Sequence, residues 1–139
     1  MIASFNYNDG GRSSGGWKGR NASDCTPRSI AIATGKHYRA VRKELDALCD
    51  EMTGGIDTTT NNGTPTPVKH RYLTNAGWFI TITKGQYLKD LPQIGVYIVC
   101  LPRHSVTVID GVIQDTWDSG TSRRTKCGSP RMLGYYSKP

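Results

Sequence analysis

The sequence predicts an α+β fold in which N-terminal helices pack on a mostly antiparallel sheet formed by the C-terminal half of the chain. Apolar residues recur at helical spacing in the first half, and apolar and polar residues alternate as in strands in the second half. The length of 139 residues suits one domain with one core. We therefore expect residues 1–139 to form a single domain.

Residues 1–23 are rich in Gly, Ser and Asn and are expected to form an irregular arm with one short strand at residues 4–7. The glycine-rich part of this arm lacks the G-x-x-x-x-G-K-[ST] pattern of a phosphate-binding loop. It also lacks the strand-then-helix setting of a dinucleotide-binding loop. We therefore exclude nucleotide binding here.

The first helix is expected at residues 25–35, because Gly35 takes the position at which helices commonly end. Cys25 then lies at the N-terminus of this helix. We expect the side chain of Asp24 to cap the helix by accepting a hydrogen bond from the N–H of Thr26.

Two more helices are expected at residues 38–49 and 66–77. The former has one apolar and one charged face, and the latter begins with Thr66 as its N-cap, followed by Pro67. Between them, residues 53–66 have almost nothing to bury and predict a long flexible loop.

Strands are expected in the second half of the chain, at residues 78–83, 96–101, 105–110, 112–117 and 133–136. The run 96–101 is apolar on both faces and is therefore expected to be covered on both sides. Cys100 within this run, and Cys49 at the end of the second helix, are expected to be core thiols.

Asp110 and Gly111 stand between two apolar runs and predict a two-residue type I′ turn. Such a turn pairs the residues that flank it, which fixes the register of the hairpin. In this register His104 and Asp115 are diagonal neighbours on one face of the sheet, within side-chain reach. Asp115 is therefore expected to orient His104 and to leave one ring nitrogen free as a base.

Of the four cysteines, Cys25 is the one whose local sequence predicts reactivity. The positive end of a helix dipole and a neighbouring imidazolium both lower the pKa of a thiol. The cysteines form no C-x-x-C pair, so we expect neither a metal site nor a disulfide framework, and no cofactor. A Cys that opens a helix, followed along the chain by a His and an acid on strands, is the order of papain-like cysteine hydrolases.

Three stretches resemble a small family found in tailed bacteriophages and bacteria: YNDGGRSSGGWKG, DCTPRSIAIATGKHYRAV and RHSVTVIDGVIQDTWD. This family is itself similar to the papain-like peptidases that process bacteriocin leaders, and the resemblance covers residues 5–118. It implies a papain-like fold with Cys25 as nucleophile, His104 as general base and Asp115 as the orienting acid. It also implies a location in the host cytoplasm or on the virion.

The chain departs from the papain-like pattern at the oxyanion site. Papain-like enzymes usually carry a Gln several residues before the nucleophile, whereas the residue six before Cys25 is Gly19. The remaining candidates for the oxyanion donor are the backbone N–H of Cys25 and the side-chain amide of Asn21, with Asn8 as a weaker alternative.

Three further residues are candidates for the substrate cleft. Trp117 lies opposite His104 in the expected hairpin, and Trp17 is near the nucleophile in sequence, so either indole is a candidate wall. Arg28, one turn after Cys25, is a candidate for binding a substrate carboxylate. Ordinary packing of the two indoles and a structural ion pair of the arginine are the alternatives.

The sequence therefore predicts a cysteine-dependent hydrolase that cleaves a peptide or isopeptide bond in a protein or peptide substrate. One alternative is a cell-wall peptidase of the NlpC/P60 kind, which also has a D-C pair followed by a helix. The other is a catalytically inactive papain-like module that binds a partner or belongs to a virion.

The net charge of +7 arises at the two ends of the chain. Residues 1–43 carry eight basic and two acidic side chains and residues 101–139 carry six and three, so an anionic partner suits both ends. The chain matches no nucleic-acid-binding motif, and nucleic acid is not the expected partner. No apolar run approaches the roughly 20 residues of a membrane helix and no signal peptide is evident, so we expect a cytoplasmic protein without membrane contact.

Overall fold

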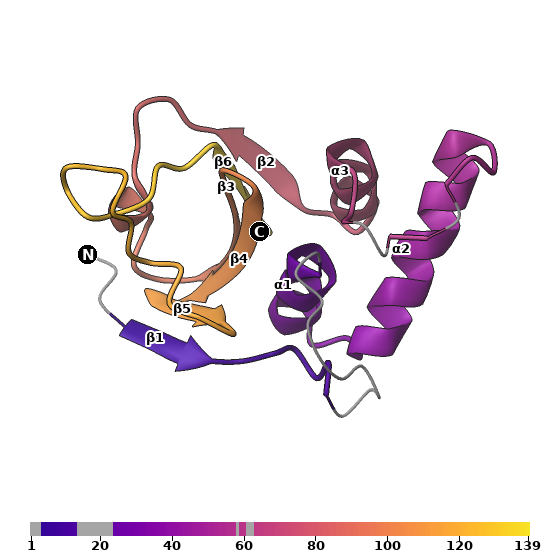
Figure 1. Cartoon of the computed structure of the whole chain (residues 1–139), viewed down its shortest axis with the longest axis horizontal. Helices are drawn as coiled ribbons and strands as arrows, with labels where there is room; N and C mark the ends of the chain where they lie inside the picture. The colour runs from indigo at the N-terminus through magenta and orange to yellow at the C-terminus, as the bar shows by residue number, and fades with distance from the viewer. Residues whose placement is uncertain (1–3, 14–23, 58, 61–62) are drawn as a thin grey trace.

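The computed structural model describes residues 4–13, 24–57, 59–60 and 63–139, which form an α+β fold (Figure 1). The predicted fold class is confirmed at this level. Along the chain the elements are β1 (Ser4–Tyr7), α1 (Cys25–Thr34), α2 (Tyr38–Thr53), α3 (Thr66–Asn75), β2 (Phe79–Ile82), the 3-10 turn η1 (Leu88–Asp90), β3 (Val96–Leu101), β4 (His104–Ile109), β5 (Val112–Asp115) and β6 (Gly134–Ser137).

The six described strands form one sheet in the order β1-β5-β4-β3-β6-β2. All neighbouring pairs are antiparallel except β1 and β5, which are parallel. The pairing of β1 with β5 brings the N-terminal segment to the end of β5, where the N–H of Asn8 donates to the carbonyl oxygen of Asp115 at 2.8 Å. Helix α1 lies directly against the sheet, and α2 packs on the other side of α1 (Figure 1).

Helix α1 begins at Cys25 and ends before Gly35, whose φ of 75° is the left-handed conformation that glycine adopts easily. This start and this end are as predicted. The predicted cap is wrong: the carboxylate of Asp24 makes no hydrogen bond to the backbone of the helix. It accepts hydrogen bonds from the side chains of Arg28 and Tyr38 instead, because burial next to these donors satisfies it better than the helix end does.

Helix α2 continues to Thr53, four residues beyond the predicted end, because the first residue that breaks it is Gly54 in the left-handed conformation, with φ 65°. The described part of the following loop is tied to α2. Both the N–H and the hydroxyl of Thr60 donate to Asp46 Oδ1, at 2.6 and 2.7 Å.

The other boundaries differ from prediction by one or two residues. Thr66 is the first residue of α3 and Pro65 occupies the N-cap position with no side-chain cap, so the predicted N-cap is wrong. Strand β5 ends at Asp115 rather than Trp117, because the chain turns away where the carboxylate of Asp115 accepts from the N–H of Thr116.

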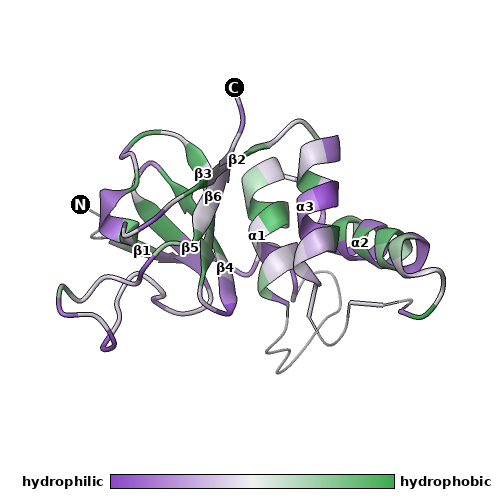
Figure 2. Cartoon of the chain, turned by 90° about the horizontal axis from the view of Figure 1, so that it is seen from above, coloured by the Kyte–Doolittle hydropathy of each residue, from purple (hydrophilic) through white to green (hydrophobic). Residues whose placement is uncertain are grey.

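Apolar side chains cover both faces of the sheet, as predicted for β3. The cluster between helices and sheet consists of Ile30, Ala31, Tyr38, Val41, Leu45, Cys49, Val68, Leu73, Trp78, Ile98 and Tyr136. The cluster on the other face, closed by η1 and by the segment before β6, consists of Leu88, Leu91, Val99, Leu101, Val106, Val108, Ile113 and Met132. In Figure 2 the green apolar segments accordingly lie on the helices and on the central strands.

The two thiols predicted to lie in the core have different environments. Cys49 is fully buried, as predicted. Cys100 is only partly buried and lines a pocket, so its assignment to the core is wrong; the helical side of β3 is open at this position. Within the described ranges, no helix has the length and the apolar character needed to cross a membrane.

Candidate active site

The β4–β5 hairpin brings His104 and Asp115 together. Asp110 and Gly111 both have positive φ, 49° and 80°, and the residues that flank them pair, so the predicted turn and register are confirmed. His104 is the first residue of β4 and Asp115 the last of β5, and His104 Nε2 lies 2.6 Å from Asp115 Oδ2.

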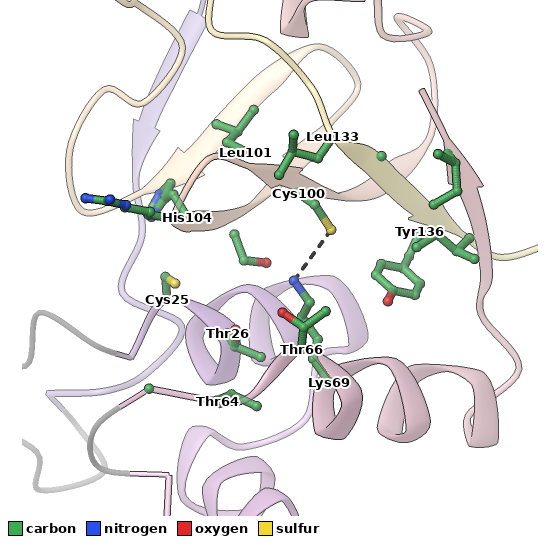
Figure 3. A pocket seen from close by; sticks show the side chains of 16 residues that line it. Cys25, Thr26, Thr64, Thr66, Lys69, Cys100, Leu101, His104, Leu133 and Tyr136 are labelled. Carbon is green, nitrogen blue, oxygen red and sulfur yellow. Dashed lines mark hydrogen bonds between the residues drawn. The ribbon is translucent and has the colours of Figure 1, made fainter. Parts of the chain in front are cut away.

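Cys25 reaches the same place from the N-terminus of α1. Its thiol lies beside the ring of His104, which lowers the pKa of the thiol, and Figure 3 shows the two side chains at one end of a pocket. Because Asp115 occupies Nε2 of the imidazole, Nδ1 is the ring nitrogen that remains for the thiol. The structure thus brings together the three residues that the sequence singled out.

Buried polar contacts fix α1 against β4. The hydroxyl of Thr107 donates to the carbonyl oxygen of Ser29 at 2.6 Å, and the hydroxyls of Ser29 and Ser105 lie 3.1 Å apart. All three side chains are buried. Since Cys25 is on α1 and His104 is on β4, these contacts set the position of the thiol relative to the imidazole.

The three groups shift one another's pKa. Burial raises the pKa of the Cys25 thiol, but the adjacent, charged ring of His104 outweighs this effect and holds the pKa below its ordinary value. Burial lowers the pKa of His104, whereas Asp115 and Cys25 together raise it to about 9. Since the imidazolium is the weaker acid of the two, the thiolate–imidazolium pair is favoured over the neutral pair.

The carboxylate of Asp115 is buried and each of its oxygens has two donors. Oδ2 accepts from His104 and from the Ser119 hydroxyl at 2.8 Å, and Oδ1 accepts from Arg28 Nη1 and the Thr116 N–H, each at 2.7 Å. Burial raises the pKa of Asp115, but the contacts with His104 and Ser119 lower it to about 2. The carboxylate is therefore ionised and held in one orientation.

Arg28 belongs to a buried ion-pair network and not to a substrate cleft, so its assignment to the cleft is wrong and the ion-pair alternative holds. Its Nε donates to Asp24 Oδ1 at 2.9 Å while its Nη1 binds Asp115, and the residue is only 6% exposed. Asp24 also accepts from Arg12 Nη1 at 3.2 Å and from the Tyr38 hydroxyl at 2.9 Å. The i,i+4 spacing of Asp24 and Arg28 was the signal in the sequence for this pair.

Of the two tryptophans predicted as candidate walls of the substrate cleft, the structure describes only Trp117. Trp117 is 53% exposed and its ring centroid lies 5.0 Å from that of His104, at an interplanar angle of 41°. It covers one side of the imidazole but does not line the pocket next to Cys25. Trp17 lies outside the described residues.

The oxyanion candidates are reduced to those near the nucleophile. The side-chain amide of Asn8 donates to Gln114 at 3.2 Å, so it is engaged elsewhere. The N–H of Cys25 belongs to the first turn of α1, where N–H groups have no partner within the helix. Asn21 lies outside the described residues.

A pocket of about 500 Å³ extends from Cys25 and His104 along the junction of α1, α3 and the sheet (Figure 3). Most of its wall could not be predicted from the sequence, because the segments that form it are far apart in the chain. The residues that line it are Cys25, Thr26, Gly63, Thr64, Thr66, Lys69, Ile80, Ile82, Cys100, Leu101, Arg103, His104, Ser105, Leu133, Gly134 and Tyr136.

In the part of the chain that the structure describes, no three His, Cys, Asp or Glu side chains gather as metal ligands would. Comparison of the chain with known protein families, with curated proteins and with solved structures finds no match.

Proposed function

We propose that this chain is a papain-like cysteine hydrolase that cleaves a peptide or isopeptide bond. The observation that carries the proposal is the placement of the Cys25 thiol at the end of a pocket, beside the ring of His104, whose Nε2 is hydrogen-bonded to the buried carboxylate of Asp115. A nucleophile, a base and a group that orients the base are the parts that acyl transfer needs.

In the acylation step the thiolate of Cys25 attacks the carbonyl carbon of the substrate. A C–S bond forms and the carbonyl π electrons move onto the oxygen, which the N–H of Cys25 is placed to stabilise at the start of α1. The imidazolium of His104 then gives its proton to the leaving nitrogen as the C–N bond breaks. An amine leaves, and a thioester and a neutral His104 remain.

In the deacylation step neutral His104 takes a proton from water, and the water oxygen attacks the thioester carbon. The C–S bond breaks, the sulfur leaves as the thiolate and a carboxylic acid is released. The imidazolium and the thiolate are thereby restored. Asp115 holds Nε2 throughout, so Nδ1 faces the reacting atoms in both steps.

The proposal predicts selective alkylation of Cys25 by iodoacetamide near pH 6. Cys25 should react at least about tenfold faster than the exposed thiol of Cys127, because the neighbouring imidazolium of His104 lowers the pKa of Cys25 and stabilises its thiolate. Substitution His104→Ala should abolish the difference. Site-resolved mass spectrometry measures both rates in the same sample, with Cys127 as the internal control.

Equal labelling of the two thiols, or a Cys25 rate that His104→Ala leaves unchanged, would contradict an activated nucleophile. The reaction itself is tested on peptide, isopeptide and peptidoglycan substrates with the wild-type protein and its Cys25→Ala and Cys127→Ser variants. Cleavage must be lost in Cys25→Ala and retained in Cys127→Ser. If peptidoglycan were the one substrate cleaved, the enzyme would be a cell-wall peptidase and the proposed protein or peptide substrate would be wrong.

A further inference from the structure

We propose that the pocket beside Cys25 binds a carboxylate group of the substrate, and that Lys69 is the residue that recognises it. The inference rests on the proposed hydrolase function, since it names the chemical class of the group that enters the same pocket. The group belongs either to an acidic side chain or to the C-terminal end of a peptide.

Lys69 is a buried cation that points into the pocket. It lies on α3 and is only 8% exposed, and its Nζ lines the cavity at mid-length, between the end with Cys25 and the end with Tyr136 (Figure 3). The one hydrogen bond that Nζ makes within the described ranges goes to the sulfur of Cys100 at 3.5 Å. A buried ammonium group that is not paired with an anion is costly, and a thiol is a weak acceptor.

No carboxylate of the protein pairs with Lys69. All 11 acidic side chains of the chain belong to the residues that the structure describes. None of them forms an ion pair with Lys69, and none lines the pocket. Of the other basic side chains of the wall, Arg103 is exposed and His104 is paired with Asp115. The pocket therefore has an excess of positive charge that an anionic ligand would balance.

A second donor in the same wall has no hydrogen-bond partner among the described residues. The hydroxyl oxygen of Thr64 is buried and makes no hydrogen bond within the described part of the chain, and Thr64 lines the pocket together with Lys69 (Figure 3). Buried hydroxyl groups are nearly always hydrogen-bonded. One ammonium group and one hydroxyl group offer donors for the two oxygens of a carboxylate.

The remaining wall suits the aliphatic part of such a ligand. Ile80 and Ile82 on β2 and Leu133 before β6 are 37%, 75% and 44% exposed and line the pocket. Gly134 keeps β2 close to β6, because a Cβ there would lie 2.8 Å from the carbonyl oxygen of Thr81. Apolar walls around one charged group are typical of ligand sites. The pocket is therefore complementary to a short aliphatic chain that ends in a carboxylate.

Three probes of nearly equal size test the proposal through the alkylation of Cys25. N-iodoacetyl-glutamate α-amide carries a side-chain carboxylate, N-iodoacetyl-glutamine carries a C-terminal carboxylate, and N-iodoacetyl-glutamine amide carries none. We expect one of the two acids to alkylate Cys25 about tenfold faster than the neutral probe, because a charge-assisted hydrogen bond is worth about that factor. The faster acid identifies the source of the carboxylate.

Lys69→Met should bring the ratio of acid to neutral probe close to one, and Lys69→Arg should retain part of it. Thr64→Val should reduce the ratio to a smaller extent. Lys43→Met, which removes a charge from an exposed position on α2, is the matched control and should leave the ratio unchanged. An unchanged ratio in Lys69→Met, or equal rates for all three probes, would overturn the proposal.

Thermal unfolding separates recognition from a structural role. Removal of an unpaired buried charge should leave the melting temperature of Lys69→Met equal to or above that of the wild type. A lowered melting temperature together with an unchanged probe ratio would assign Lys69 to structure alone.

Equilibrium binding separates this proposal from the proposed function. N-acetyl-glutamate α-amide and N-acetyl-glutamine are titrated into the Cys25→Ala protein, and amide chemical shifts of α3 and β2 are followed by NMR. Binding that depends on Lys69, with no reactivity of Cys25 toward any probe, would support the subsite and reject the hydrolase. A reactive Cys25 without carboxylate preference or binding would reject the subsite alone.

Discussion

Asp115 controls the site through its charge as well as its shape. Its carboxylate is a hydrogen-bond acceptor for His104 and is also the buried counter-ion of Arg28. The first contact raises the pKa of His104, and the raised pKa of the imidazolium favours the thiolate of Cys25. One buried carboxylate therefore both orients the imidazole and favours the thiolate form of Cys25.

Substitution Asp115→Asn should preserve the shape of this group and remove its charge. The pKa of His104 should fall toward its ordinary value and the pKa of Cys25 should rise, so the alkylation rate near pH 6 should fall by about tenfold or more. Stability should fall by about 1 to 3 kcal/mol, since Arg28 loses one of two carboxylate partners. The pH profile of alkylation and a denaturant titration measure the two effects.

Ser119→Ala is the matched control, because it removes a single hydrogen bond to Asp115 Oδ2 and leaves the charge in place. The pH profile of Cys25 alkylation in Ser119→Ala should shift only slightly from that of the wild type. If Asp115→Asn and Ser119→Ala gave the same profile, the charge of Asp115 would have no part in the activation of Cys25.

At the scale of elements, the site depends on how α1 is held against β4. The two elements carry Cys25 and His104, and side-chain hydroxyls within the core link them. Thr107 is fully buried, and its hydroxyl donates to the carbonyl oxygen of Ser29 in the middle of α1. A small shift of α1 would change the distance between Cys25 and His104 without unfolding either element.

Thr107→Val should weaken this link while retaining the volume of the side chain. We expect a loss of about 1 to 3 kcal/mol in stability, because the carbonyl oxygen of Ser29 loses a buried donor. The alkylation rate of Cys25 at pH 6 should fall, whereas that of Cys127 should stay the same. Thr107→Ser keeps the hydroxyl and should restore the Cys25 rate. A Cys25 rate in Thr107→Val equal to that of the wild type would show that this link does not position the thiol.

At the scale of the whole molecule, the ion pair affects how stability depends on pH. The pKa of His104 is raised from 6.5 to about 9, so its contribution is fully present below pH 6.5 and is lost as the pH rises through about 9. The pKa of Cys25 is lowered from 9.0, so its contribution is present above pH 9.0 and is lost as the pH falls. Between these limits the two trends oppose each other.

The wild-type protein should therefore show little change in its free energy of unfolding between pH 6.5 and 9. In this range the folded pair holds one proton, on His104, and the unfolded pair also holds one, on Cys25. In Cys25→Ala the folded state keeps the proton on His104 through Asp115 while the unfolded state holds none. Its stability should fall by about 1 kcal/mol per pH unit as the pH rises.

Urea titrations at several pH values measure this difference, and the double variant Cys25→Ala/His104→Ala is the control that should be flat again. A wild-type protein that lost stability with pH as steeply as Cys25→Ala would mean that the thiol keeps its proton in the folded state. The thiolate–imidazolium pair would then be excluded.

The sequence by itself determined the features that depend on neighbouring residues. The turn at Asp110 and Gly111 requires positive φ at both residues, and this local geometry fixed the register that brings His104 and Asp115 together. The start of α1 at Cys25 was likewise a local property. The sequence could therefore name the three residues at the centre of the site before any tertiary contact was known.

Only the tertiary structure decided what these residues touch across the molecule. Arg28 and Asp115 are 87 residues apart in sequence. No local sequence pattern predicts that the Arg28 guanidinium binds Asp115 as well as the nearby Asp24. In the same way, no local feature of the sequence distinguishes Lys69, and it is the packing of α3 that brings its ammonium group into the pocket beside Cys100. Local conformation follows from neighbouring side chains, whereas burial and pairing of charges follow from how distant segments pack.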